Sequence, residues 1–452
     1  MSTLQQAACQ VPLDRGVPAL MLKIGQYPVH SGGLGVLRSL GRCGVPVYAI
    51  TEPGLPPAAV SRYMTGRFVS RATGRERPDS LIPGLVAAGR HIGTRSVIVS
   101  IDDEAAVLVA EHREELSEHF LLPDVAPGLP VCLASKTGLF ELCRRHGISA
   151  PASVTPGSVD EVADFAATAR FPVVVKNADP WQRRRQPVVP HTTVLDSPGE
   201  LLALVRRDPR DGSGPGGDGS AEPAPGLILQ EYLPIEQAED WISHLYADAE
   251  SDCVVMLTGR KVRSWPPYAG LTASAYTVFN PELAALAERF CKEIGYSGIG
   301  DLDWRLDLRD GQYKLVDFNP RPGNPFRLFE NEAGVDVVRA LHLDLTGRDV
   351  PRAREVEGKR ISVEHVDIPA RLVYWLHDRR APSAGPAEPA RPGPAPHSPE
   401  PGPTEYAWLA TDDPLPFFVM IPHALRTAAG VLGRKLRGRA RTSRQRWRKA
   451  SL

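Results

Sequence analysis

The chain has 452 residues, and its 53 basic residues balance its 53 acidic residues, so the formal net charge is zero. A chain of this length exceeds a single hydrophobic core and is expected to divide into about three lobes. The balanced charge argues against a polyanionic partner, so we expect no nucleic acid to bind. The N-terminus MSTLQQAACQVPLDRG has no apolar signal core, and no segment approaches the ~20 apolar residues of a membrane span. We therefore predict a soluble, cytoplasmic protein, whose oligomeric state the sequence leaves open.

The cysteines are scattered along the chain, without a Cys-x-x-Cys pair or the spacing of a metal site. This pattern predicts buried free thiols in a reducing compartment. The six are Cys9, Cys43, Cys132, Cys143, Cys253 and Cys291.

Residues 1–125 have the β-α-β pattern of a small Rossmann-like domain. The glycine-rich turn His30-Ser31-Gly32-Gly33 leads from the first predicted strand into a helix. Such a turn can cradle a phosphate, and it can equally serve tight packing, so both interpretations stay open. The predicted strands are Val17–Ile24, Val45–Thr51 and Ser96–Ile101.

Two lysines follow structural signals in the next segment, which we place at 126–350. Ser135 is the predicted N-cap of a helix that begins at Lys136. The β-branched strand Phe171–Asn177 carries Lys176 at its C-terminal end. Because buried lysines are rare unless an anion is nearby, Lys176 indicates a phosphate contact. The alternative is a lysine whose ammonium reaches water at the strand edge.

A hairpin near the end of this segment carries candidate metal ligands. Its second strand ends in Asp317-Phe318-Asn319, and alternation along the strand places Asp317 and Asn319 on one face. Asp303, on the partner strand, can face them if the turn is Arg309-Asp310-Gly311. These oxygen ligands, followed by Arg321, predict a Mg²⁺ site beside a phosphate. The alternative is a solvated hairpin face with incidental acids, which the following Asn-Pro-Arg-Pro-Gly argues against.

A basic segment lies between these two features in the sequence. Arg260, Lys261 and Arg263 follow a predicted strand, and alternation puts Lys261 and Arg263 on one face. That face would suit a substrate carboxylate or a γ-phosphate, whereas the alternative is a basic strand that faces solvent. Arg305 shares its parity with Asp303 and is expected to point into the same site.

The order of these elements from Leu20 to Gly347 resembles the ATP-grasp superfamily, in its carboxylate–amine ligase branch. The resemblance rests on the two lysines, a strand ending Gln-Glu-Tyr-Leu-Pro, the segment GRKVRSWPP and the hairpin GIGDLDWRLDLRDGQYKLVDFNPR. It implies an α/β and α+β fold, in which a Rossmann-like N-terminal domain precedes two lobes that sandwich ATP.

The resemblance also implies roles for individual residues. The nucleotide-binding residues would be Lys136 and Lys176 at the phosphates, Glu231, Tyr232 and Leu233 at the adenine edge, and Glu239 or Asp240 at the ribose. The metal, Mg²⁺ with Mn²⁺ as an alternative, would be held by Asp303, Asp317 and Asn319. The catalytic cations would be Arg260, Lys261, Arg263, Arg305 and Arg321.

Two features depart from the family pattern. Asp303 and Asp317 stand where the family commonly has glutamate, although aspartate remains a good ligand for a hard cation. The glycine-rich lid expected after Lys176 is replaced by the arginine-rich loop PWQRRRQP. Its three arginines, Arg183, Arg184 and Arg185, are candidates for a phosphate clamp or for substrate contacts.

A ligase of this branch activates a carboxylate as an acylphosphate, which an amine then attacks with release of ADP and phosphate. The expected cofactors are ATP and Mg²⁺, and the expected partners are small, amino-acid-like carboxylate and amine substrates. Two alternatives stay open. One is a nucleotide-binding regulatory protein with a degenerate site, and the other is a small-molecule kinase on the same fold.

The C-terminal part has a different composition. Segments 351–380 and 405–422 are expected to pack on the ligase body, the first through its apolar run RLVYWLHD and the second as a returning strand within Tyr406–Ile421. Residues 208–226 and 381–404 are rich in Gly and Pro and predict a flexible insertion and a linker. The basic tail 423–452 either solubilises the protein or makes weak contact with an anionic membrane or nucleic acid.

Overall fold

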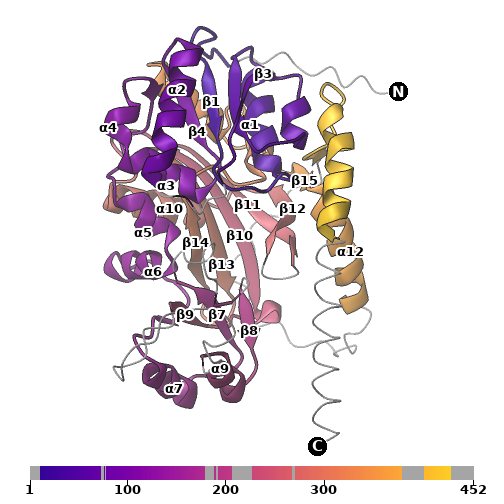
Figure 1. Cartoon of the computed structure of the whole chain (residues 1–452). Coiled ribbons are helices and arrows are strands. Elements are labelled where there is room, and N and C mark those ends of the chain that lie inside the picture. Colours follow the sequence, from indigo (N-terminus) through magenta and orange to yellow (C-terminus); the bar gives the residue numbers. More distant parts are fainter. Residues whose placement is uncertain are drawn as a thin grey trace, which may run out of the picture.

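The computed structural model describes residues 11–72, 76, 78–178, 188–189, 192–205, 226–266, 270–378 and 402–428. The predicted insertion up to residue 225, most of the predicted linker, the tail beyond 428 and the three arginines of the lid segment lie outside these residues. Within them, the chain forms an N-terminal α/β domain, a small β-lobe and a large antiparallel sheet (Figure 1).

The N-terminal domain confirms the predicted Rossmann-like pattern. Its described strands form a parallel sheet in the order β3-β2-β1-β4-β5. The strands are β1 Ala19–Leu22, β2 Val47–Thr51, β3 Met64–Val69, β4 Ser96–Ser100 and β5 Phe120–Leu121. The helical elements are α1 Ser31–Gly41, α2 Ile82–Ile92, α3 Asp103–Glu111, α4 Arg113–Leu116, η1 Pro57–Val60 and η2 Pro78–Leu81. Leucines of α1 cover one face of the sheet, and α2 and α3 cover the other.

Close packing accounts for the glycines at the start of α1. His30 is the N-cap, and its Nδ1 accepts a hydrogen bond from the amide of Gly33 at 3.1 Å. A Cβ on Gly33 would lie 2.9 Å from a methyl of Ile101, and a Cβ on Gly35 would lie 2.9 Å from the ring of Phe326. The helix therefore approaches the sheet and the neighbouring loop more closely than side chains would permit.

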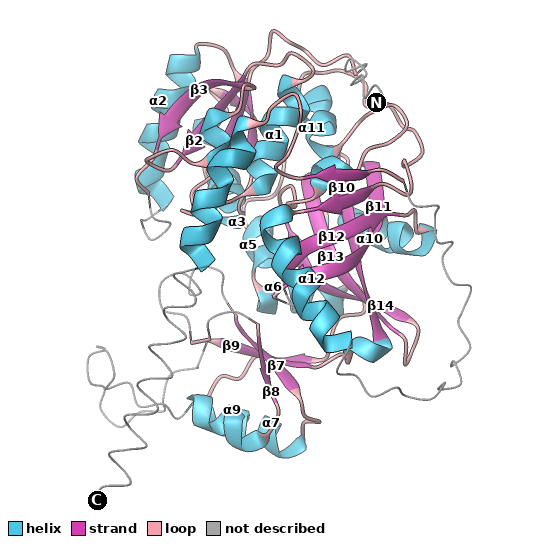
Figure 2. Cartoon of the chain, turned by 90° about the vertical axis from the view of Figure 1, so that its right-hand side faces the viewer, coloured by secondary structure: helices cyan, strands magenta, loops and turns pink. Residues whose placement is uncertain are grey.

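The small lobe is reached through α5 (Leu129–Ala134) and α6 (Lys136–Arg145). Its described strands pair in the order β6-β9-β7-β8. They are β6 Ser153–Val154, β7 Val173–Asn177, β8 Thr193–Leu195 and β9 Leu227–Glu231. Helices α7 (Val159–Thr168) and α9 (Pro198–Val205) lie at the outer end of the molecule in Figure 2 and share the core of this lobe. Because one face of the sheet packs on these helices, Lys176 lies on the other face.

The large sheet has the order β14-β13-β10-β11-β12-β15-β16 in the described part of the chain. Its strands are β10 Ala238–Ala247, β11 Cys253–Trp265, β12 Leu271–Thr277, β13 Gly298–Asp307, β14 Gln312–Asn319, β15 Arg360–Ser362 and β16 Thr404–Tyr406. Helix α10 (Pro281–Ile294) packs on one face. Part of the other face shares a core with the N-terminal domain, α11 (Val337–Leu345) and η5 (Phe326–Leu328). A further 3-10 turn, η4 (Ile235–Gln237), precedes β10.

The C-terminal part differs from the prediction in two respects. The predicted returning strand within Tyr406–Ile421 is wrong beyond Tyr406, because a helix covers 415–428. Its apolar residues recur with helical spacing, and Phe417 and Met420 pack on the body. In helix α12 (Glu364–Asp378), the predicted apolar run contributes little to the core. Val366 and Ala370 are buried instead, because they lie on the inner face of the helix.

Two further predictions can be compared with the structure. Cys43 is disulfide-bonded, so the prediction of a free thiol is wrong at this position. Cys143 and Cys291 are free and buried, as predicted. Among the helices of the described residues, none combines the length and the apolar character needed to cross a membrane.

Candidate active site

The hairpin β13–β14 brings its acidic residues together. Asp303 pairs directly opposite Asp317, and Asp301 pairs directly opposite Asn319. The register shifts after Asp303, so a β-bulge separates this end of the ladder from the pairs nearer the turn. Four oxygen-bearing side chains therefore lie on neighbouring positions of one sheet face.

The two adjacent strands extend the same face. Asp240 on β10 pairs opposite Arg305, and the Nε of Arg305 donates to the Asp240 carboxylate at 2.7 Å. Lys261 on β11 reaches across the sheet, and its Nζ donates to the Asp303 carboxylate at 2.5 Å. We call the surface formed by Asp240, Lys261, Asp301, Asp303, Arg305, Asp317 and Asn319 the charged face.

Both predicted lysines approach the charged face from the small-lobe side. Lys136, at the first turn of α6, forms a short ion pair with Asp317. Its helix begins at the predicted N-cap, whose Ser135 hydroxyl accepts a hydrogen bond from the Gly138 amide at 3.3 Å. Burial and the nearby Lys136 ammonium lower the pKa of Lys176 to about 8. Lys176 therefore lies close enough to Lys136 for their charges to interact, and an anion placed between the two would be attracted to both.

The acidic end of the charged face concentrates negative charge. Burial and the neighbouring Asp303 carboxylate raise the pKa of Asp301 to about 7. Burial also lowers the pKa of His244 to about 3, so its imidazole is neutral. The His244 Nδ1 lies 3.1 Å from an Asp301 oxygen. Asp301 and Asp303 therefore share a region where a bound cation would relieve repulsion between carboxylates.

Arg321 lies at the edge of this acidic region. Its guanidinium donates to Asp103 of α3 at 2.9 Å and to the side-chain oxygen of Asn319 at 3.0 Å. Burial disfavours its charged form, but Asp103 and Asp301 outweigh that effect and raise the pKa of Arg321. It thus links the N-terminal domain to the end of β14.

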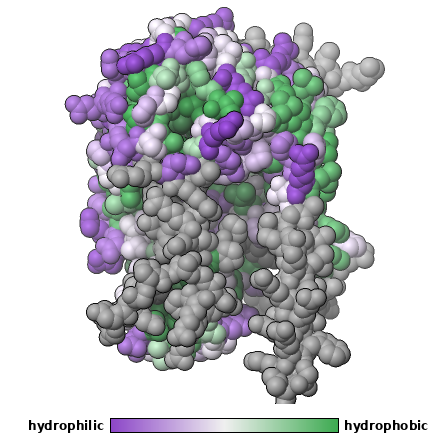
Figure 3. Space-filling model, viewed as in Figure 1, coloured by the Kyte–Doolittle hydropathy of each residue, from purple (hydrophilic) through white to green (hydrophobic). Residues whose placement is uncertain are grey.

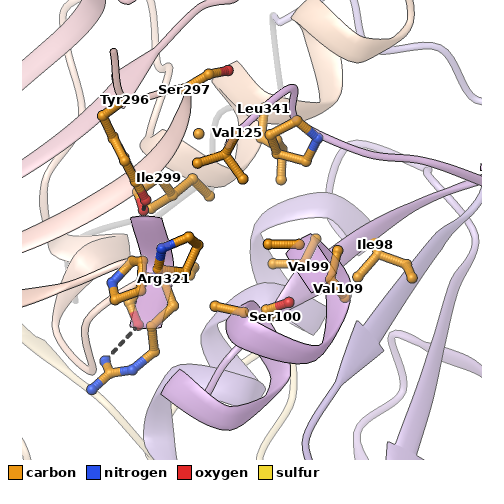
Figure 4. A pocket seen from close by; sticks show the side chains of 17 residues that line it. Ile98, Val99, Ser100, Val109, Val125, Tyr296, Ser297, Ile299, Arg321 and Leu341 are labelled. Carbon is orange, nitrogen blue, oxygen red and sulfur yellow. Dashed lines mark hydrogen bonds between the residues drawn. The ribbon is translucent and has the colours of Figure 1, made fainter. Parts of the chain in front are cut away.

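A small cavity of about 60 Å³ lies behind Arg321. Figure 4 shows Ile98, Val99 and Val109 of the N-terminal domain on one side and Ile299 with the stem of Arg321 on the other. The guanidinium points away from these apolar side chains. Because its lining is mainly apolar, we interpret this cavity as a packing gap between the domains.

Three of the predicted site residues do not contribute to the charged face. Glu239 and Arg260 form an ion pair of 2.6 Å and lie on the opposite face, since strand neighbours alternate. Of the two candidates for the ribose contact, Asp240 alone shares the charged face. Arg263 donates to Asp367 of α12 at 2.7 Å, across an irregular stretch of the β11–β12 pairing.

The predicted adenine-edge residues form the connection between the two lobes. Glu231 ends β9, and its carboxylate accepts from the Ala152 amide at 3.1 Å and from Lys314 at 3.2 Å. Tyr232 follows, and the Leu233 carbonyl accepts from Arg305 at 3.2 Å. Arg305 therefore connects this segment to the charged face.

No group of three or more His, Cys, Asp or Glu side chains arranged to hold a metal occurs among the described residues. Asp303 and Asp317 are each paired with a lysine instead. The donor set nevertheless fits a hard cation, because the Asp303 and Asp317 carboxylates lie opposite each other and the Asn319 amide lies on the same sheet face.

Asp301 and His244 were not identified from the sequence. Alternation along the strand could have identified Asp301, because it shares its parity with Asp303 and Arg305. No sequence pattern could have identified His244, because its position opposite Asp301 depends on the register between β10 and β13.

Comparison with known proteins gives one curated sequence relative and several structural ones. No family model matches the sequence. The D-aspartate ligase of Enterococcus faecium (strain Aus0004) is 24% identical over 245 residues, which are 50% of this chain and 53% of that protein. The chain thus spans about half the length of the curated relative that it matches.

Two solved structures have a similar fold. The L-amino acid ligase of Bacillus licheniformis gives a TM-score of 0.52 at 14% identity, covering 74% of this chain and 75% of that chain. The biotin carboxylase domain of Hydrogenobacter thermophilus 2-oxoglutarate carboxylase, solved with MgADP, ADP and bicarbonate, gives 0.51 at 15% identity, covering 75% and 71%. At these identities the likeness shows the fold alone.

Proposed function

Because this chain has the ATP-grasp fold, we propose that it is an ATP-dependent ligase that joins a carboxylate to an amine through an acylphosphate. The products would be an amide, ADP and phosphate. The D-aspartate ligase and L-amino acid ligase among its relatives support amino-acid-like substrates.

The observation that carries this proposal is the pairing of lysines with carboxylates on the charged face. Lys136 bonds Asp317 and Lys261 bonds Asp303. When ATP enters, its phosphates would attract both ammonium groups and leave the two aspartates available to a metal ion. The arrangement therefore suits a polyanion and a cation that bind together.

The charged residues of the site would bind the charged parts of ATP and the metal ion. Lys136 and Lys176 would hold the phosphates from the small-lobe side, and Arg305 would keep the adenine-edge segment in place through the Leu233 carbonyl. Asp303, Asp317 and Asn319, with Asp301 beside them, would hold Mg²⁺, which when bound supplies positive charge to the phosphates.

Lys261, attracted to the γ-phosphate, would neutralise negative charge there while the carboxylate substrate attacks the phosphorus. That carboxylate oxygen forms a bond to phosphorus while the bond to ADP breaks. The amine then attacks the acyl carbon, and phosphate leaves with the original carboxylate oxygen and takes up the proton that the amine loses. Most of the rate would come from orientation and from charge neutralisation, because each step develops negative charge.

The labelling test uses a carboxylate substrate that carries ¹⁸O in its carboxyl group. Candidates come from a screen of amino acids and small acids for ADP release, with and without an amine. In a ligase reaction we expect one ¹⁸O in each released phosphate, and phosphate in equal amount to amide. A stable phosphorylated product without free phosphate would instead identify a kinase. ADP release that no acid or amine stimulates would contradict the ligase proposal.

Lys176→Met is expected to weaken ATP binding by about 1.5–3 kcal/mol, the range for hydrogen bonds to charged groups. Its ammonium lies near Lys136 and Asp317, so its loss would remove one phosphate contact. The measurement is the rise in melting temperature that ATP produces, which should shrink while the melting temperature without ATP changes little. Lys292→Met, at an ion pair on the surface, is the control. If ATP raises the melting temperature of Lys176→Met as much as that of the parent, the Lys176 ammonium makes no phosphate contact and only extends into solvent.

A further inference from the structure

The end of the described chain is attached to the N-terminal domain by buried polar contacts. Arg38 of α1 is fully buried, and its Nε donates to the Asp413 carboxylate at 3.0 Å. Its other nitrogens donate to the carbonyls of Ala407 and Trp408 at 3.0 and 2.8 Å. Because these contacts immediately precede the helix over 415–428, that helix starts from a fixed position.

The helix over 415–428 is apolar on both sides. Met420, with Phe417 and Ala424 beside it, packs on the protein core. The outward side should be polar on an ordinary surface helix. Instead, Phe418 and Leu425 are 60% and 65% exposed, and they belong to a stripe of exposed apolar residues at helical spacing. The stripe consists of Leu415, Phe418, Ile421 and Leu425.

Helix α12 likewise has one buried and one exposed apolar face. Its inner face is buried through Val366 and Ala370. Its outer face exposes Ile368 at 69% and Leu372 at 58%, followed by Trp375 and Leu376. Figure 1 draws the helix over 415–428 in yellow on the same side of the molecule as α12, and Figure 3 shows hydrophobic surface on the upper part of that side. Single exposed apolar residues are ordinary, but a group of this size on two neighbouring helices indicates an interaction surface.

The sequence that continues from this surface is strongly basic. Residues 426–452 contain ten of the 53 basic residues of the chain and none of the acidic ones. Positive charge next to exposed Phe, Leu, Ile and Trp is the combination that binds the surface of an anionic bilayer, where apolar side chains enter the interface and basic ones remain near the headgroups. Nucleic acid would be attracted by the positive charge, but its binding would not account for the stripe of exposed apolar residues.

We propose that the outer faces of α12 and of the helix over 415–428 bind the surface of an anionic lipid membrane. The ligase body would then sit on the membrane without crossing it. Apolar contact and charge attraction would both be needed, so binding should require anionic lipid and should weaken as salt increases.

The test is sedimentation of the full chain with vesicles of phosphatidylglycerol and phosphatidylcholine, compared with vesicles of phosphatidylcholine alone. We expect binding to the anionic vesicles only. The double variant Phe418→Ser, Leu425→Ser should weaken vesicle binding at least about tenfold. Full burial of either apolar side chain in the membrane interface would by itself change the affinity by more than that factor. Val69→Ser with Val194→Ser, which replaces exposed apolar residues on β3 and β8, is the matched control and should bind within about twofold of the parent.

Three outcomes would overturn the proposal. The first is equal vesicle binding by the parent and by the Phe418→Ser, Leu425→Ser variant. The second is a dimer in size-exclusion chromatography that this variant dissociates, without any vesicle binding by the parent, because the surface would then bind a second copy. The third is binding to single-stranded RNA that exceeds vesicle binding and that the variant retains.

Discussion

Asp317→Asn is expected to reduce ADP formation at least about a hundredfold while the protein remains folded. The carboxylate lies opposite Asp303 and beside Lys136, so it serves both the predicted metal site and the lysine that approaches the phosphates. Replacing it with an amide removes one negative charge from the metal ligands, a loss comparable to that of one preorganised electrostatic group in other enzymes. The measurement is the rate of ADP release under saturating ATP and Mg²⁺.

The control for this variant is Asp310→Asn, on the turn of the same hairpin. Asp310 accepts a hydrogen bond from the Gln312 amide, which an asparagine oxygen can also accept, so this variant should keep the parent rate. Circular dichroism and the melting temperature establish that both variants are folded. Turnover of Asp317→Asn within a few-fold of the parent would contradict both the metal assignment and the function built on it.

Arg38→Met is expected to lower the free energy of unfolding by about 3–5 kcal/mol, the range for removing one partner of a buried ion pair. The substitution leaves Asp413 buried without its cation and also frees the carbonyls of Ala407 and Trp408. We expect a large fall in the urea midpoint, together with faster proteolysis of residues 402–428. Arg38→Met combined with Asp413→Asn should recover part of the loss, because the uncompensated charge is gone.

Arg113→Met is the matched control for this stability experiment. Arg113 pairs with Asp124 at 3.4 Å on the surface, where an ion pair contributes about 0–1 kcal/mol. A fall in stability of Arg38→Met no larger than that of Arg113→Met would show that the buried pair does not hold the C-terminal segment in place.

Local patterns predicted much of the fold and part of the candidate site. The helix that begins at Lys136 follows from Ser135 as N-cap, and strand β7 follows from a run of β-branched residues. The hairpin follows from its tight turn, but the turn alone does not set the site. It pairs Asp307 with Gln312, and the β-bulge after Asp303 is also needed to bring Asp303 opposite Asp317. These features depend on residues close together in the sequence, so their signals lie in a short window.

Contacts between distant segments could not be predicted in the same way. His244 meets Asp301 only through the pairing of β10 with β13, and Arg321 meets Asp103 across more than two hundred residues. The pairing of Arg260 with Glu239 on the far face depends on how β10 and β11 align. No local spacing encodes these alignments, because they are set by the packing of whole sheets and helices.

The C-terminal part shows the same division. The sequence by itself determined that residues 426–452 are basic and that the preceding segment is apolar. Only the tertiary structure decided which apolar side chains face the core and which face outward, because that choice depends on where Arg38 and its partners hold the chain. On the charged face, too, the sequence determined which charges are present, and the sheet register decided which of them meet, since pairing across strands is a property of the folded chain.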